Sequence, residues 1–100
     1  MGVLGVFLGW STAPAGDGLS RLYAVDSAPV EVRRCPHSSC ETVARWNTGT
    51  RVEMVCFRDT ETVSYNYGSN RWFNIHEPQT GQAGWVHSSQ VSHQTRVGRC

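Results

Sequence analysis

The feature that most limits the fold of this chain is a series of short strand-like runs separated by turn residues. The runs are rich in Val, Ile, Trp and Phe and alternate apolar with polar residues, which is typical of strands with one buried face. No stretch of ten residues has the apolar period of an amphipathic helix. The runs lie at 29–33, 42–46, 51–58, 71–75 and 83–87, with a shorter piece around 89–91. The sequence therefore predicts an all-β domain, a small barrel or paired sheets of five or six short strands.

The alternation also predicts which side chains face the core. The groups expected to share a buried face are Val30 with Val32, Val52 with Met54 and Cys56, and Phe73 with Ile75. Trp72 falls on the opposite face from Phe73 and Ile75. Trp85 stands between Gly84 and Val86, which indicates an inward packing slot and a core position.

Four cysteines, Cys35, Cys40, Cys56 and Cys100, stand in a chain with little material for a core. About 75 residues remain once the N-terminal segment is set aside, and apolar burial in so small a domain leaves a few kcal/mol after chain entropy. Disulfides are the expected supplement, and four cysteines can pair in three ways. The turn-rich residues between Cys35 and Cys40 favour a bridge between these two, which leaves Cys56 to pair with Cys100.

The N-terminal segment has the character of an export signal or a membrane anchor. Residues 3–10 are apolar but too few for a bilayer, which needs about 20 residues, and Ala13 and Ala15 form the small-x-small pattern of a cleavage site. An apolar N-terminal strand is the alternative. We therefore assign residues 1–15 to a truncated signal peptide or anchor, 16–21 to a linker, and 22–100 to the domain with a disulfide-tethered tail. Export would place the chain outside the cell or in its envelope, where disulfides persist.

Composition and motifs argue against several classes of function. A net charge of +1 with 17% charged residues does not suit binding to duplex nucleic acid or to an anionic membrane surface. His37 lies between two cysteines, but their spacing is looser than a zinc knuckle and there is no second such pair. Ser, His and Asp occur without a nucleophile motif, and so small a domain has little room for a substrate cleft. We expect no catalysis, no metal and no cofactor.

Five motifs follow one another across residues 23–92. They are Val30-x-Val32-Arg33, Asn47-Thr48-Gly49-Thr50, Val52-x-Met54-Val55, Trp72-Phe73-x-Ile75 and Gly84-Trp85-Val86. In this order and spacing they resemble the bacterial SH3 (SH3b) domain. The paired cysteines and residues 95–100 look like a variant in exported actinobacterial proteins. The resemblance implies an SH3-like barrel without catalytic apparatus, of a kind that directs envelope proteins to peptidoglycan or to peptides.

Exposed aromatic side chains are the leading candidates for a binding site, because small barrels hold peptides or sugars in aromatic grooves. The predicted ligand-binding residues are Trp72, Tyr65, Tyr67, Asn70 and Arg71. In the other interpretation the tyrosines cap the end of the barrel and Arg71 is a solvated charge.

The sequence thus predicts a monomeric, non-catalytic module that binds peptidoglycan or an envelope peptide through an aromatic face. One alternative is a secreted protein–protein interaction module, an inhibitor or accessory subunit, that binds another exported protein and not the wall. A purely structural extracellular domain is the other.

Overall fold

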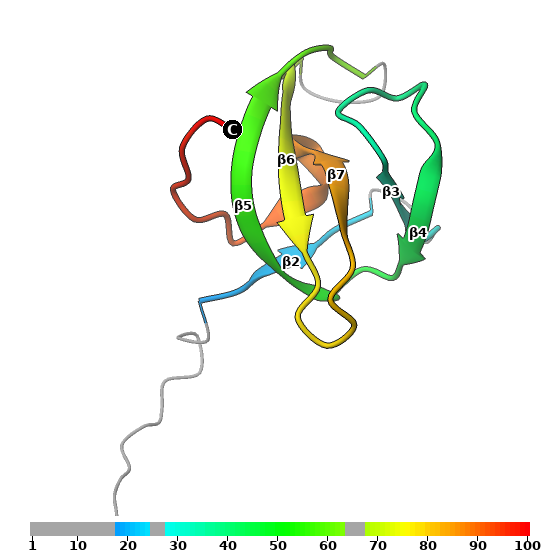
Figure 1. The fold of residues 1–100 in the computed structure, drawn as a ribbon, viewed down its shortest axis with the longest axis vertical. Helices are drawn as coiled ribbons and strands as arrows, with labels where there is room; N and C mark the ends of the chain where they lie inside the picture. The colour runs from blue at the N-terminus through cyan, green and yellow to red at the C-terminus, as the bar shows by residue number, and fades with distance from the viewer. Residues whose placement is uncertain (1–17, 25–27, 64–67) are drawn as a thin grey trace, which may run out of the picture.

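Seven antiparallel strands form one sheet in residues 18–24, 28–63 and 68–100, the part of the chain that the computed structural model describes. The strands are β2 (Ser20–Leu22), β3 (Val30–Arg33), β4 (Thr42–Trp46), β5 (Arg51–Asp59), β6 (Arg71–His76), β7 (Ala83–His87) and β8 (Val91–Ser92), and a 3₁₀ turn, η3 (Ser88–Gln90), precedes β8. Their order across the sheet is β4-β3-β7-β6-β5-β2-β8, and Figure 1 shows β5 as a long curved strand. The predicted all-β fold is confirmed.

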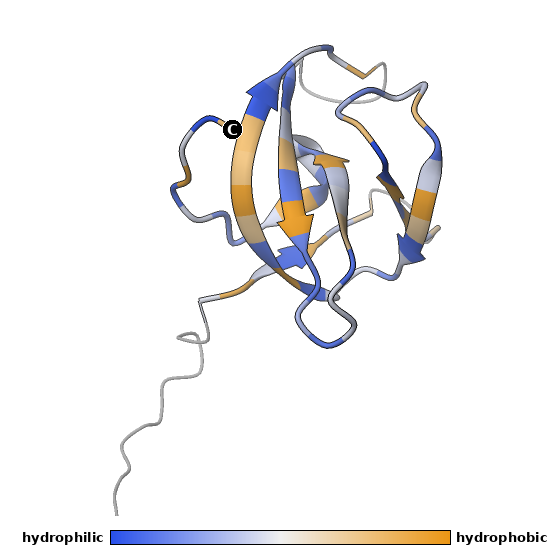
Figure 2. Cartoon of the chain, in the orientation of Figure 1, coloured by the Kyte–Doolittle hydropathy of each residue, from blue (hydrophilic) through white to orange (hydrophobic). Residues whose placement is uncertain are grey.

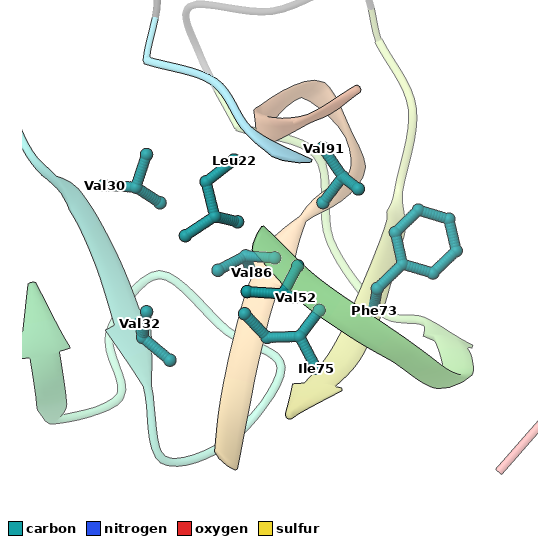
Figure 3. Close-up of a cluster of buried hydrophobic side chains, with 8 residues drawn as sticks. All are labelled: Leu22, Val30, Val32, Val52, Phe73, Ile75, Val86 and Val91. Atoms are coloured by element: carbon teal, nitrogen blue, oxygen red, sulfur yellow. The ribbon is translucent and has the colours of Figure 1, made fainter. Parts of the chain in front are cut away.

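The sheet curls around one apolar core. The core residues are Leu22, Val30, Val32, Val52, Phe73, Ile75, Val86 and Val91, and they come from strands near both ends of the sheet order. Figure 3 shows these side chains gathered between the strands. In Figure 2, orange marks the middle of β5 and alternates with blue along β6, whereas the connecting loops are mostly hydrophilic. Because one cluster is reached from so many strands, the domain is a small barrel-like sheet.

The strand count exceeds the predicted five or six because β2 begins inside the range assigned to the linker. Ser20 is fully buried, pairs with Val52 of β5 and donates its hydroxyl to the carbonyl oxygen of His93 at 2.9 Å. The linker assignment is therefore wrong for residues 20 and 21. A polar residue can enter a buried strand when its hydroxyl has an acceptor. Residues 1–17 lie outside the described part, so the export segment stays a prediction.

A β-bulge at Val55 changes the faces of β5. Met54 stands opposite Ile75, whereas Cys56 stands opposite Asn74, so Val55 is the extra residue. Met54 therefore shares the core face with Ile75, and Cys56 lies on the outer face with Asn74. The expectation that Cys56 shares the core face is wrong. The bulge instead turns the Cys56 sulfur toward the C-terminal segment that passes outside β5.

Gly84, and not Trp85, faces the core on β7. A Cβ atom on Gly84 would lie 2.5 Å from Cγ1 of Val32 and 3.0 Å from the carbonyl oxygen of Arg33, so its missing side chain lets β3 approach. Trp85 is half-buried and lies with Asn74 on the outer face. The predicted core position of Trp85 is therefore wrong, because Gly84 holds the place where β3 and β7 meet.

We expect Gly84→Ala to lower the free energy of unfolding by about 1–3 kcal/mol, because the new methyl group must displace Val32 and main-chain atoms of β3. Gly98→Ala is the matched control. A Cβ atom there would meet nothing within 4 Å, so its effect should stay within about 0.5 kcal/mol. Urea denaturation of the oxidised chain measures both values. Equal stability of the two variants would contradict the close approach of β3 and β7.

Candidate functional site

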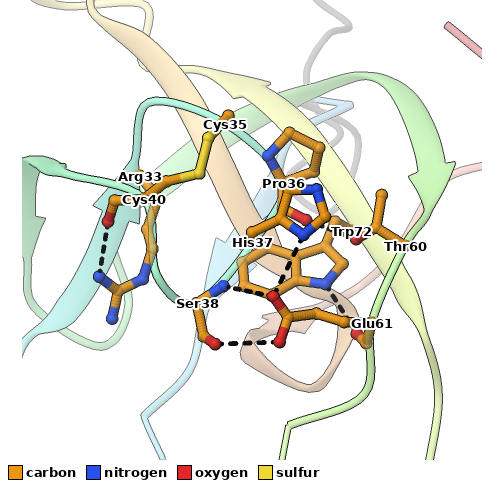
Figure 4. A network of polar contacts seen from close by, with 9 residues as sticks. All are labelled: Arg33, Cys35, Pro36, His37, Ser38, Cys40, Thr60, Glu61 and Trp72. Carbon is orange, nitrogen blue, oxygen red and sulfur yellow. Dashed lines mark hydrogen bonds and ion pairs between the residues drawn. A yellow bond between two sulfur atoms is a disulfide. The ribbon is translucent and has the colours of Figure 1, made fainter.

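A polar latch joins the disulfide loop between β3 and β4 to the segment after β5 (Figure 4). Cys35 and Cys40 are bonded with their Cα atoms 5.7 Å apart, which confirms this predicted pair. Inside the loop, the N–H and hydroxyl of Ser38 donate to the Glu61 carboxylate at 2.9 and 3.0 Å, and Nδ1 of His37 lies 3.2 Å from it. The latch therefore fixes two connecting segments against each other.

The latch contains a serine, a histidine and an acid, but it lacks the order of a catalytic triad. In a triad the histidine accepts the serine proton and the acid orients the histidine. Here the Ser38 hydroxyl donates directly to Glu61, and His37 contacts Glu61 as well. The histidine is thus not placed to activate the hydroxyl, and the arrangement acts as a structural link.

The Glu61 carboxylate gives the latch a dependence on pH. Hydrogen bonds from the main-chain N–H and hydroxyl of Ser38 hold the pKa of Glu61 below its ordinary value of 4.5. The resulting stabilisation is complete above pH 4.5 and is lost as the pH falls through the folded-state pKa. We expect Glu61→Gln to be less stable than the wild type at about pH 7, with a smaller difference at about pH 3. Thermal unfolding at both values measures this, and a difference that does not change with pH would contradict it.

Trp72 is buried, so it provides no exposed aromatic surface. It points away from Phe73 and Ile75 as the alternation predicts, yet only 2% of it is exposed. Its Nε1–H donates to the carbonyl oxygen of Glu61 at 2.9 Å, and its ring packs edge-on against His87 with centroids 5.4 Å apart. The prediction that Trp72 contacts a ligand is corrected for this reason: the segment after β5 covers the outer face of β6.

Asn70 and Arg71, two of the predicted ligand-binding residues, line a common pocket at the start of β6. The pocket has a volume of about 280 Å³ and we call it the β6 pocket. The residues that line it are Ser69, Asn70, Arg71, Phe73, Ser88 and Gln94. Tyr65 and Tyr67 lie outside the described residues, so their part in a binding site stays a prediction.

Arg71 is held rigidly at the β6 pocket. Its Nε and Nη2 atoms donate to the two carboxylate oxygens of Asp59 at 2.9 and 3.2 Å, a bidentate pair. Its guanidinium carbon lies 3.7 Å from the centre of the Phe57 ring. The hydrogen bonds from Arg71 hold the pKa of Asp59 below its usual value, so the carboxylate is ionised at neutral pH. The β6 pocket therefore has a fixed planar cation in its lining.

The turn η3 forms one wall of the β6 pocket, and hydrogen bonds around the buried His87 fix this wall. Nδ1 of His87 accepts from the Ser89 N–H at 3.1 Å, so Nε2 carries the proton and donates to the Ser69 carbonyl oxygen at 2.7 Å. The Ser88 hydroxyl donates to the Ser69 hydroxyl, and the Gln94 amide donates to the Ser88 carbonyl oxygen, both at 3.1 Å. Ser69, Ser88 and Gln94 were not predicted as site residues, because isolated small or polar residues near strand ends form no sequence pattern that indicates a binding site.

Cys56 and Cys100 form the second disulfide, with their Cα atoms 4.9 Å apart, which confirms the other predicted pair. Two disulfides are consistent with an extracellular location. Within the described ranges, His, Cys, Asp and Glu side chains form no group of three or more that could hold a metal ion. A helix with the length and apolar character for crossing a membrane is also absent from those ranges.

Searches of protein-family models, curated proteins and solved structures return no match to this chain. The resemblance to the SH3b domain therefore stays a prediction from the order of its motifs.

Proposed function

We propose that this domain is a non-catalytic binding module that works outside the cytoplasm and holds a segment of peptidoglycan, or of an envelope peptide, in the β6 pocket. The observation that carries the proposal is the convergence of hydroxyl, amide and guanidinium groups on one pocket. Polar groups that converge on a pocket are one criterion by which a binding site is recognised. Peptidoglycan presents hydroxyl, amide and carboxylate groups, which are hydrogen-bonding complements of this lining.

Asn70 is the pocket residue best placed to contact a ligand. It is exposed, and its side-chain amide makes no hydrogen bond to the described residues. Its backbone is fixed, because the Thr60 N–H donates to the Asn70 carbonyl oxygen at 2.8 Å. An amide on a fixed backbone can both donate to and accept from a ligand without breaking an internal bond.

The disulfides and the latch support a mechanism of recognition by a rigid surface. Both disulfides would persist in the oxidising environment of the envelope. The latch holds the start of the connection between β5 and β6, and the Asp59–Arg71 pair joins its two ends beside the β6 pocket. A site held in this way loses little conformational entropy when a ligand binds.

Peptidoglycan fragments from a muramidase digest should shift the amide resonances of residues 69–71 and 88 in NMR spectra of the oxidised full chain. Asn70→Ala should weaken this binding by about 2- to 10-fold, because one neutral hydrogen bond contributes about 0.5–1.5 kcal/mol. Asn47→Ala, at the exposed turn after β4, is the matched control and should leave the affinity unchanged.

Equal affinity of the two asparagine variants, or shifts confined to residues outside the β6 pocket, would refute the choice of site. Complete absence of shifts would refute peptidoglycan binding and favour the alternative in which the partner is another exported protein.

A further inference from the structure

The C-terminal segment lies along an open edge of β5. Strand β2 pairs with only the first two residues of β5 and does not reach its other end. There, the Phe57 N–H donates to the carbonyl oxygen of Gly98, and the Cys100 N–H donates to the carbonyl oxygen of Phe57, both at 3.0 Å. Arg99 forms a parallel bridge with Phe57, and Figure 1 shows the segment beside β5. The Cys56–Cys100 disulfide fastens this docked segment.

The docked segment brings Arg99 to the residues that anchor Arg71. The Arg99 guanidinium carbon lies 4.9 Å from the centre of the Phe57 ring, and its Nη1 atom lies 3.7 Å from Oδ2 of Asp59. Arg71 contacts the same ring and the same carboxylate. Two arginines that are 28 positions apart in the chain thus share one aromatic ring and one counter-ion.

In this cluster beside the β6 pocket, positive side chains outnumber negative ones. Two guanidinium groups face a single carboxylate, and within the described residues the ion pairs of both arginines go to Asp59. The side chains of Arg71 and Arg99 are 42% and 67% exposed. A guanidinium has five N–H donors and Asp59 takes two from Arg71, so donors remain for a ligand.

We propose that Arg71 and Arg99 form a carboxylate-binding site at the edge of the β6 pocket, assembled by the Cys56–Cys100 disulfide. The inference rests on the proposed function, since it names the ligand group that the same pocket takes: the acidic end of a peptide. A planar carboxylate matches the fork of a guanidinium and carries the charge opposite to that of the two arginines. Without the disulfide, Arg99 is held near Asp59 only by non-covalent contacts of the C-terminal segment, chiefly its main-chain hydrogen bonds to Phe57, and Asp59 neutralises an isolated Arg71.

The probe for this site is N-acetyl-alanyl-alanine with a free carboxylate, compared with the same dipeptide as its C-terminal amide. NMR titration of the oxidised full chain should show the acid shifting Asn70 and Arg71 signals with an affinity about two- to fivefold above that of the amide. Added salt should reduce the affinity for the acid, because charge attraction at an exposed site is screened over about 8–10 Å.

Arg99→Gln should remove most of this preference while both disulfides remain. Arg58→Gln is the matched control. Arg58 is an exposed arginine of β5, but it stands opposite Trp72, on the face of the sheet away from Phe57 and Asp59. Equal binding of acid and amide by the wild type, or an undiminished preference in Arg99→Gln, would overturn the inference. If Arg99→Gln loses no preference yet peptidoglycan fragments still shift the β6 pocket, this inference fails and the proposed function stands. If the fragments shift nothing, the proposed function fails whatever the dipeptides do.

Discussion

Replacing Cys56 and Cys100 together with alanine should lower the free energy of unfolding by about 4 kcal/mol. The disulfide joins residues 44 positions apart, and in the chain-entropy model the stabilisation grows with the logarithm of the loop that it closes. The bond also fixes the segment that covers the edge of β5 and packs the partly buried Val97 against the core. Because a small domain has only several kcal/mol of total stability, the double variant should be close to unfolding at physiological temperature.

The matched control for this prediction is the double alanine variant of Cys35 and Cys40. Its disulfide joins residues only 5 positions apart, so the same model gives a stabilisation of about 2 kcal/mol. Urea denaturation measures both values, with intact mass used to verify the remaining disulfide in each variant. A larger loss from the Cys35–Cys40 pair than from the Cys56–Cys100 pair would contradict the order of the two effects.

Trp72→Ala should lower the free energy of unfolding by about 3–5 kcal/mol, the usual cost of removing a buried tryptophan side chain. The substitution leaves a cavity between β6 and the segment after β5 and removes the donor to the Glu61 carbonyl oxygen. It also removes the edge-on ring contact with His87. Urea denaturation of the oxidised chain gives the value.

Trp72→Phe separates packing from the hydrogen bond. It keeps an aromatic ring but loses the Nε1–H, so we expect a smaller loss, about 1–3 kcal/mol. If Trp72 instead formed an exposed binding surface, both substitutions would change stability by less than about 0.5 kcal/mol. Such a result would contradict the covered position of this residue.

The alternation of residues was sufficient to predict which face most side chains occupy, but not what covers the outer face. Trp72 lies opposite Phe73 and Ile75 as predicted, yet it is buried, because the latch through Glu61 brings a distant segment over it. The two-residue alternation of side chains describes the two faces of one strand and contains no information on long-range contacts. The bulge at Val55 escaped prediction for a related reason, since an extra residue in one strand is defined only by the register of its partner.

The disulfide pairing was predictable because it depends on local and countable properties. Turn residues between Cys35 and Cys40 allowed the short bridge, and the even count then left one partner for Cys56. The β6 pocket was only partly predictable. Asn70 and Arg71 could be predicted from the sequence because they follow a polar loop. Ser88 and Gln94 could not, because they join the pocket through the turn η3 and its hydrogen bonds.

Co-sedimentation of the oxidised full chain with purified peptidoglycan sacculi is the most direct test of the claim that this domain is an envelope-binding module. We expect the wild-type chain to pellet with the sacculi at low and physiological salt, and the folded Asn70→Ala variant to pellet to a smaller extent. A wild-type chain that remains in the supernatant at every salt concentration would contradict the proposal that this domain binds peptidoglycan.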